Sequence, residues 1–181
     1  MNLLWIDAET TGLSSDKHSI IDICFVETNR KGVEQKRYTS KIKPSADWKK
    51  YAESRAMEVN HYTDEEWAEA PEIWTVEEAL IKVFGTDADK GELLIPAGWN
   101  IPFDLGFIRE KFNFWDDKSR KRIKFYHHPL DLMGLGWNYI KDKPRAHLND
   151  LCDRLGAELK DAHTAEGDVN AYIECYKRLL Y

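Results

Sequence analysis

The segment LLWIDAETTGL, residues 3–13, joins a short run of apolar residues to two acids that lie one residue apart. Residues 3–6 have the continuous apolar composition of a buried strand. In an extended segment, residues i and i+2 face the same side, so Asp7 and Glu9 point together while Ala8 points away. Their Cα atoms are then about 6.5–7 Å apart, and both carboxylates can reach one divalent cation or flank two. Because a buried acidic pair is costly without a counter-charge, the segment predicts a cationic partner.

The composition is that of a globular chain. Of its 181 residues, 43% are hydrophobic and 32% are charged, and we expect a single domain over residues 1–181. The chain has no apolar run of membrane-spanning length and no basic signal-peptide region at its start, so we expect a cytoplasmic protein with no membrane partner. Cys24, Cys152 and Cys175 are odd in number and widely spaced, which predicts reduced core cysteines. The net charge of −6 argues against coating of nucleic acid by bulk electrostatics.

Strand signals open the chain, and helical signals alternate with further strands after them. We predict strands over residues 2–7, 19–28 and 33–43, the last polar enough to be an edge, a hairpin connection at 29–32, a buried strand over 93–98 and an extended segment at 125–130. We predict helices over residues 75–84 (with Thr75 and Glu78 in capping-box spacing), 102–112, about 132–139, 147–156 (closed by Gly156) and 164–180. This order favours an α/β fold with a mixed sheet.

A second acid lies in GWNIPFDLGF, residues 98–107. Asp104 follows a predicted buried strand at the start of a helix, a junction that often presents functional groups. A purely structural interpretation is also open, because the helix dipole favours acids in a first turn and Asn100 can serve as a helix cap.

The third candidate is DAHTAEGDVNAY, residues 161–172. His163 and Asp168 are five residues apart, which on one continuous helix separates them by about 140°. They converge only if His163 precedes the helix, and Thr164 as a capping residue is consistent with that break. A histidine placed in such a loop titrates near neutrality and suits a general base. Taken together, four acids and one histidine at the ends of predicted elements favour metal-assisted phosphoryl chemistry.

Three motifs in this order resemble a known family. DAETTG (7–12), NIPFD (100–104) and HTAEGD (163–168) are similar to the three motifs of the DEDDh subgroup of the DEDD, DnaQ-like 3′–5′ exonuclease superfamily. The resemblance implies a ribonuclease H-like fold, a mixed β-sheet flanked by α-helices. It further implies two Mg²⁺ or Mn²⁺ ions and hydrolysis from the 3′ end of single-stranded DNA or RNA, with release of nucleoside 5′-monophosphates by a two-metal mechanism. A protein partner such as a polymerase or nuclease complex is compatible with it.

The resemblance also assigns roles by position. It implies that Asp7, Glu9 and Asp168 hold the first metal, that Asp7 and Asp104 hold the second, and that His163 activates the attacking water. VNHYT (59–63) is similar to the family segment that holds the 3′-terminal nucleotide, although the family commonly has glycine where His61 stands. The substrate-binding residues implied in this way are Thr10, Thr11, Gly12, Leu13, Asn60, His61, Asn100 and Phe103.

Two other interpretations are open. A catalytically silent nucleic-acid-binding module on the same fold would be expected to lack one of the five motif residues, and none is missing. A subunit on the same fold whose partner controls processivity or access is compatible with all five residues and stays open. DAET also resembles the nucleophile motif of haloacid-dehalogenase-type phosphatases, but that chemistry prefers Asp where Glu9 stands and leaves HTAEGD without a role. Among the remaining features, the basic residues at 118–124 could guide a strand and Trp99 could contact substrate, although both types of residue more often have only structural roles.

Overall fold

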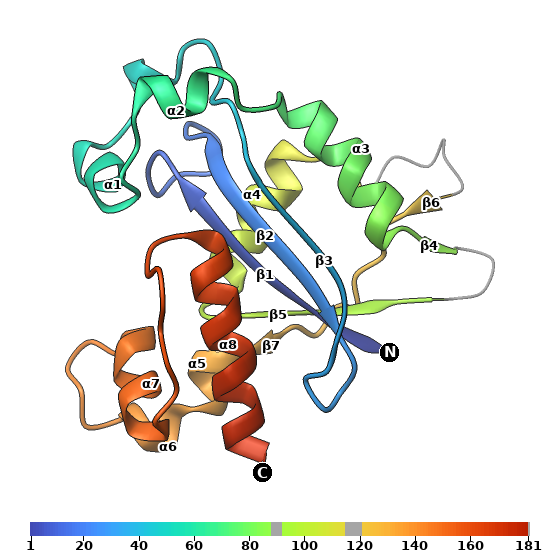
Figure 1. The fold of residues 1–181 in the computed structure, drawn as a ribbon, viewed down its shortest axis with the longest axis vertical. Coiled ribbons are helices and arrows are strands. Elements are labelled where there is room, and N and C mark those ends of the chain that lie inside the picture. The colour runs from blue at the N-terminus through green and yellow to red at the C-terminus, as the bar shows by residue number, and fades with distance from the viewer. Residues whose placement is uncertain (88–91, 115–120, 181) are drawn as a thin grey trace.

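The protein is built on a five-stranded mixed sheet with helices on both faces (Figure 1). The computed structural model describes residues 1–87, 92–114 and 121–180. The strand order is β3-β2-β1-β5-β7, with bounds Asn2–Thr10 for β1, Ile20–Thr28 for β2, Glu34–Lys41 for β3, Leu94–Gly98 for β5 and Leu130–Asp131 for β7. β1 pairs antiparallel with β2 and parallel with β5, and β7 is parallel to β5. The predicted α/β fold with a mixed sheet is confirmed, and β3 is an edge strand as its polar sequence indicates.

The central strand β1 is longer than predicted. It continues past the apolar run to Thr10 because β2 goes on pairing with it, and Glu9 lies opposite Asp22 in the register. Both acids of the opening segment are therefore inside a strand. Pairing with β5 ends earlier, at Trp5 opposite Ala97, so the C-terminal half of β1 is free of β5 on that side.

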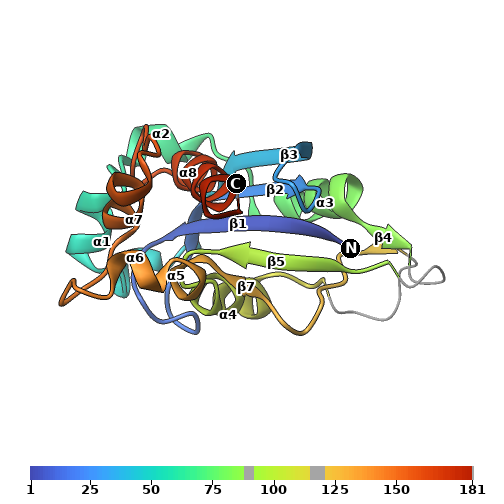
Figure 2. The same cartoon turned by 90° about the horizontal axis from the view of Figure 1, so that it is seen from below.

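Two hydrophobic cores lie on the two faces of this sheet. One core joins the sheet to α3 (Ile73–Phe84) and α4 (Pro102–Lys111), and the other joins it to α7 (Leu148–Leu155) and α8 (Ala165–Leu180). Figure 2, which views the sheet from below, shows α8 and α4 on opposite sides of β1 and β5. β1 supplies side chains to both cores, and this alternating burial fixes the strand rigidly.

The helix boundaries follow the sequence signals with two differences. α3 begins at Ile73 with Glu72 in the cap position, so Thr75 lies inside the helix and the predicted capping box does not form. The helix predicted at 132–139 is split into α5 (Leu132–Leu135) and α6 (Trp137–Ile140), which meet at Gly136. The closure of α7 by Gly156 is confirmed, because that residue has the left-handed φ of 67° that favours glycine.

A group of short elements between β3 and α3 was not predicted. They are a 3₁₀ helix at Trp48–Lys50, α1 (Ser54–Val59) and α2 (Asp64–Ala68). Aromatic contacts hold them together, since the ring of Tyr62 lies 4.7 Å from that of Trp48 and 4.9 Å from that of Trp67. The indole of Trp67 donates a hydrogen bond of 2.6 Å to the Ile21 carbonyl, which attaches the group to β2. A second small sheet, β4 (Thr86–Asp87) with β6 (Lys121–Arg122), was likewise not predicted.

Two expectations about membranes and cysteines can be compared with the structure. Within the described residues, no helix is both long enough and apolar enough to cross a membrane. Cys24, Cys152 and Cys175 are buried and unbridged, as predicted from their spacing.

The packing of α3 on the sheet predicts the effect of a core truncation. Leu80 on α3 is fully buried, and its replacement by alanine removes buried methyl groups and leaves a cavity. We expect Leu80→Ala to lower the free energy of unfolding by about 2–5 kcal/mol, measured by urea denaturation. Trp74 lies on the same helix but is 61% exposed, and we expect Trp74→Ala to change the free energy of unfolding by less than about 0.5 kcal/mol. Equal effects of the two variants would contradict this packing.

Candidate active site

The strand geometry places the first two acids on one face of the sheet. Ile6 and Ala8 belong to the core beneath α3 and α4, whereas Trp5 belongs to the core beneath α8. Asp7 and Glu9 continue the row of Trp5 and therefore face α8. β1 thus delivers two carboxylates toward the beginning of that helix.

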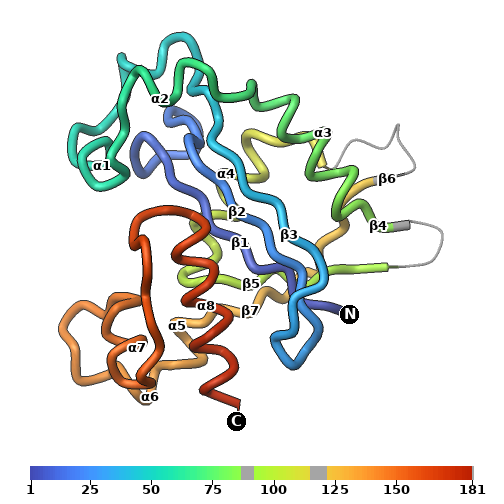
Figure 3. Tube along the Cα trace, viewed as in Figure 1, coloured from blue at the N-terminus to red at the C-terminus, as the bar shows by residue number. Residues whose placement is uncertain are grey.

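The beginning of α8 supplies the third acid and the histidine. The Thr164 hydroxyl accepts a hydrogen bond of 3.1 Å from the Gly167 amide, and the helix begins at Ala165. His163 therefore lies outside the helix, exposed and with a φ of 65°, while Asp168 lies in the first turns. The break that the sequence required between these two residues is present. In Figure 3 the connection from α7 carries the start of α8 to the same end of the molecule as the C-terminal end of β1.

Gly167 explains how this connection packs against the helix. A Cβ atom at Gly167 would lie 2.3 Å from the Asp161 carbonyl oxygen and 2.5 Å from that of Lys160. Only glycine allows so close an approach of the backbone that leads to His163. The glycine of HTAEGD therefore has a packing role in positioning the histidine.

The carboxylates of Asp7, Glu9 and Asp168 come together although they lie on two elements far apart in sequence. Their ligand oxygens all lie within 4.8 Å of one another, a spacing that suits a shared cation. Asp104 reaches the group from the other side of the sheet, at the start of α4. It is buried, and its Oδ1 accepts a hydrogen bond of 3.0 Å from the Ala8 amide, just beyond the point where β5 stops pairing with β1.

The electrostatics of the cluster are dominated by burial and by repulsion between the acids. Burial raises the pKa of Asp7 well above the ordinary carboxyl value, and repulsion by Asp104, Glu9 and Asp168 raises it further. Burial likewise raises the pKa of Glu9 to about 8 and that of Asp168 to about 6, while the His163 charge and backbone amide act to lower the pKa of Asp168. Burial also raises the pKa of Asp104. Hard oxygen ligands that repel one another in a buried position fit divalent cations.

Sequence reasoning missed two residues of this cluster. The Tyr172 hydroxyl donates a hydrogen bond to Oδ1 of Asp7. Its signal was its spacing, because it follows Asp168 by four residues and so lies on the same helical face. Asp22, which β2 places opposite Glu9, raises the pKa of Glu9. Burial raises the pKa of Asp22 itself, while the backbone amides of Ala165 and Ile23 act to lower it.

A cavity of about 400 Å³ lies beside Glu9. Its lining comes from the end of β1, from α1 and from α4, and includes the predicted residues Thr10, Gly12, Leu13, Asn60 and Phe103. The Asn60 side-chain amide donates a hydrogen bond of 2.9 Å to the Thr10 carbonyl, which holds α1 against β1. Val59, the first residue of the VNHYT segment, also lines the cavity. Sequence reasoning missed the lining residues Glu53, Arg55 and Ala56, because the six-residue α1 has no strong periodic signal.

The other three residues predicted to bind substrate do not line this cavity. Thr11 is fully buried, and its hydroxyl accepts a hydrogen bond of 3.0 Å from the Ser19 amide. His61 and Asn100 are both exposed and have positive φ. The backbone amide of Asn100 donates a hydrogen bond of 3.1 Å to the Asp131 carboxylate. Their contact with substrate stays a prediction.

A structural contact that the sequence did not indicate explains why position 12 is a glycine. A Cβ atom at Gly12 would lie 2.5 Å from Nε2 of His18, which is itself buried. Nδ1 of His18 accepts a hydrogen bond of 2.8 Å from the Ser14 amide, and Nε2 lies 2.9 Å from the Tyr51 carbonyl. The glycine thus lets the segment after β1 close over His18, and His18 in turn connects that segment to the chain leading into α1.

Trp99 and the basic residues at 118–124 are the other two candidates for contact with substrate. Trp99 is half-buried and packs against the core beneath α8, which favours a structural role. Of the basic residues at 118–124, Lys118 and Arg120 lie outside the described residues.

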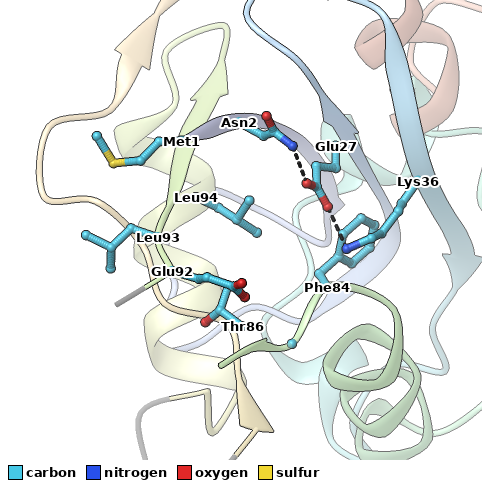
Figure 4. A pocket seen from close by; sticks show the side chains of 10 residues that line it. Met1, Asn2, Glu27, Lys36, Phe84, Thr86, Glu92, Leu93 and Leu94 are labelled. Atoms are coloured by element: carbon cyan, nitrogen blue, oxygen red, sulfur yellow. Dashed lines mark hydrogen bonds and ion pairs between the residues drawn. The ribbon is translucent and has the colours of Figure 1, made fainter. Parts of the chain in front are cut away.

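A larger cavity of about 460 Å³ lies at the opposite end of β1 (Figure 4). Its buried acid, Glu27, accepts a hydrogen bond of 2.7 Å from Asn2 and pairs with Lys36 at 2.9 Å. The charge of Glu27 is therefore neutralised within the protein, unlike the charges beside the smaller cavity. The acid cluster makes the smaller cavity the better candidate for an active site.

Comparisons with known proteins identify the family of the chain and its fold. The family model RNase_T, described as exonuclease, matches residues 4–176, and the chain belongs to this family within the DEDD 3′–5′ exonuclease superfamily. No curated protein sequence matches the chain.

Solved structures show the same fold. The chain is similar to the zinc-bound E. coli exonuclease I–single-stranded DNA complex (TM-score 0.75, 19% identity, 97% of this chain and 39% of the other). It is similar to E. coli exonuclease I with a dT13 oligonucleotide (TM-score 0.71, 18% identity, 95% and 39%) and to an exonuclease I–SSB C-terminal complex (TM-score 0.71, 18% identity, 98% and 40%). The predicted ribonuclease H-like fold is confirmed. The chain spans about 40% of the length of these structures.

The raised pKa values predict how stability depends on pH when cations are removed. The folded pKa of Glu9 is about 8 against an ordinary 4.5, so between these values the folded protein binds more protons than the unfolded chain. Stability contributed by the neutral acid is therefore present at low pH and is lost as pH rises from about 4.5 to about 8. We expect the urea midpoint of the EDTA-treated protein to fall over this range, and Glu9→Gln to flatten the dependence. A urea midpoint that does not vary with pH would contradict the electrostatics of the cluster.

Proposed function

We propose that residues 1–181 form a single 3′–5′ exonuclease domain that requires two Mg²⁺ or Mn²⁺ ions. Its substrate is the 3′ end of single-stranded nucleic acid, and its products are nucleoside 5′-monophosphates. The observation that carries this proposal is the convergence of Asp7, Glu9 and Asp168 within 4.8 Å, with Asp104 beside them. Family membership supports the reaction class. The predicted cytoplasmic location stays a prediction.

The residues divide the chemistry among them. In this proposal Asp7, Glu9 and Asp168 hold one cation, and Asp7 with Asp104 holds the other. Bound divalent cations supply charge stabilisation for a phosphodiester and make water a stronger nucleophile near neutral pH. His163, exposed in the loop beside Asp168, takes the proton from the attacking water. The backbone carbonyls of Lys160 and Asp161 pack against Gly167, and the charge of His163 acts on Asp168.

The cavity beside Glu9 provides a place for the terminal nucleotide. It shares Glu9 with the acid cluster, so a nucleotide within it has its phosphodiester next to the cations. Leu13 is 74% exposed at the cavity and offers an apolar surface to a base. Phe103 on α4 supplies a second apolar side chain to the lining. Polar groups in the lining come from Thr10, Gly12 and Asn60 and from the charged residues Glu9, Glu53 and Arg55. Both DNA and RNA are candidate substrates.

A partner-dependent subunit is the second candidate function. A similar exonuclease I structure contains a C-terminal SSB segment, and the chain spans only part of that protein. In this alternative the acid cluster is the same, but degradation needs an added protein such as a polymerase.

Substrate degradation tests the central proposal directly. We expect 3′- and 5′-labelled single-stranded oligomers of DNA or RNA to shorten from the 3′ end with Mg²⁺ or Mn²⁺ and to remain intact in EDTA. Thin-layer chromatography of the product should show nucleoside 5′-monophosphates. Internal cleavage, or activity that persists in EDTA, would exclude the mechanism. Binding without degradation would favour the partner-dependent subunit, and hydrolysis of small phosphomonoesters alone would favour the phosphatase.

Point variants test the assigned roles. We expect Asp168→Asn to abolish degradation because a cation ligand loses its charge, and His163→Gln to lower kcat by about 10²–10⁴-fold because the general base is lost. Glu166→Gln is a matched control, since Glu166 lies in the same helical turn but is exposed and pairs with Arg37. Its activity should equal that of the unmodified protein. Rates are measured on a 5′-labelled oligomer with saturating Mn²⁺, and normal activity of Asp168→Asn would refute the site.

A further inference from the structure

Tyr172 is a polar residue in the core that the reaction proposed above does not use. It is 3% exposed on α8, and its hydroxyl donates a hydrogen bond to Oδ1 of Asp7. Among the described residues, the Tyr172 hydroxyl is the hydrogen-bond donor that the structure shows for the Asp7 carboxylate. Because Tyr172 follows Asp168 by one helical turn, a single face of α8 supplies both a carboxylate of the cluster and the donor to another.

Asp7 needs such a donor more than an ordinary acid does. Three other acids, Asp104, Glu9 and Asp168, act on its charge, and its side chain is 8% exposed. Repulsion from these directions does not define one orientation of the carboxylate plane, whereas a charge-assisted O–H···O⁻ bond does. A carboxylate offers about four acceptor positions, so one hydrogen bond leaves the others for cations.

The tyrosine is suited to this task because packing in the core holds its ring in place. Its ring is part of the core that also contains Trp5 and Val169. A tyrosine hydroxyl carries its proton near neutral pH and therefore acts as a hydrogen-bond donor to a carboxylate. Second-layer hydrogen bonds of this kind commonly orient metal ligands and contribute to metal affinity.

We propose that Tyr172 is a positioning residue for divalent-cation binding. Its hydroxyl holds the Asp7 carboxylate in the orientation in which Asp7, Glu9 and Asp168 bind the same cation. This inference rests on the proposed function, because the cation site is part of it. The competing interpretation is that Tyr172 serves only to fill the core.

The same helix provides a matched control. Tyr176 lies one turn further on, is 7% exposed, and its hydroxyl donates a hydrogen bond of 2.9 Å to the Arg30 carbonyl. Tyr172→Phe and Tyr176→Phe each remove one buried hydroxyl from α8 and keep the ring. Only the first removes a contact to Asp7.

Direct measurement of Mn²⁺ binding tests the proposal without depending on activity. Calorimetric titration with Mn²⁺ should show a dissociation constant about 10–100-fold higher in Tyr172→Phe than in the unmodified protein. Tyr176→Phe should bind as the unmodified protein does. In nuclease assays, Tyr172→Phe should need more Mn²⁺ for half-maximal rate and recover its rate at saturating Mn²⁺, which a general loss of packing would not produce.

The outcomes distinguish failure of the proposed function from failure of the role assigned to Tyr172. If the unmodified protein does not bind Mn²⁺, the proposed function itself fails. If it binds Mn²⁺ and Tyr172→Phe binds equally well, or if both Phe variants weaken binding alike, the role of Tyr172 is overturned.

A second pair of variants covers the case in which Tyr172→Phe does not fold. Tyr172→Gln keeps a donor without the ring, and Tyr172→Leu keeps neither. Tighter Mn²⁺ binding by Tyr172→Gln than by Tyr172→Leu supports the hydrogen bond, and the reverse order excludes it.

Discussion

Repulsion among buried carboxylates at the C-terminal end of β1 is the constraint on which the rest of the structure depends. Burial keeps the charges out of water, and proximity makes each acid raise the pKa of the next. The fold must hold these groups together against that repulsion. It does so by placing them on elements that are fixed elsewhere by apolar packing.

The two faces of the sheet divide this task. β1 pairs with β2 on one side and β5 on the other, and hydrophobic cores pack on both of its faces. Asp7 and Glu9 therefore project from a strand that is held firmly in place. α8 brings Asp168 across one face, and α4 brings Asp104 from the other. The Ala8 backbone amide, which β5 no longer pairs, donates a hydrogen bond to the Asp104 carboxylate. The end of the β1–β5 ladder is thus also the place where the fourth acid enters.

Much of the site could be predicted because its parts have local sequence signals. The alternation in β1 required Asp7 and Glu9 to face one side, and the five-residue spacing of His163 and Asp168 required a helix to begin between them. The elements from residue 48 to 68 could not be predicted in this way. They are short, lack periodicity and are held by contacts such as that of Tyr62 with Trp48 and Trp67, which join residues without a shared pattern. Part of the cavity lining was missed for the same reason.

The sequence by itself predicted which residues form the candidate site, because carboxylates at period-two spacing and a capping threonine act through local geometry. The tertiary structure decided which partners those residues meet. The hydrogen bond from Tyr172 to Asp7 joins residues 165 positions apart, and Gly12 is explained by the ring of His18 rather than by a ligand. Such contacts depend on how strands and helices pack across the sheet, and side-chain spacing along the chain contains no information about that packing.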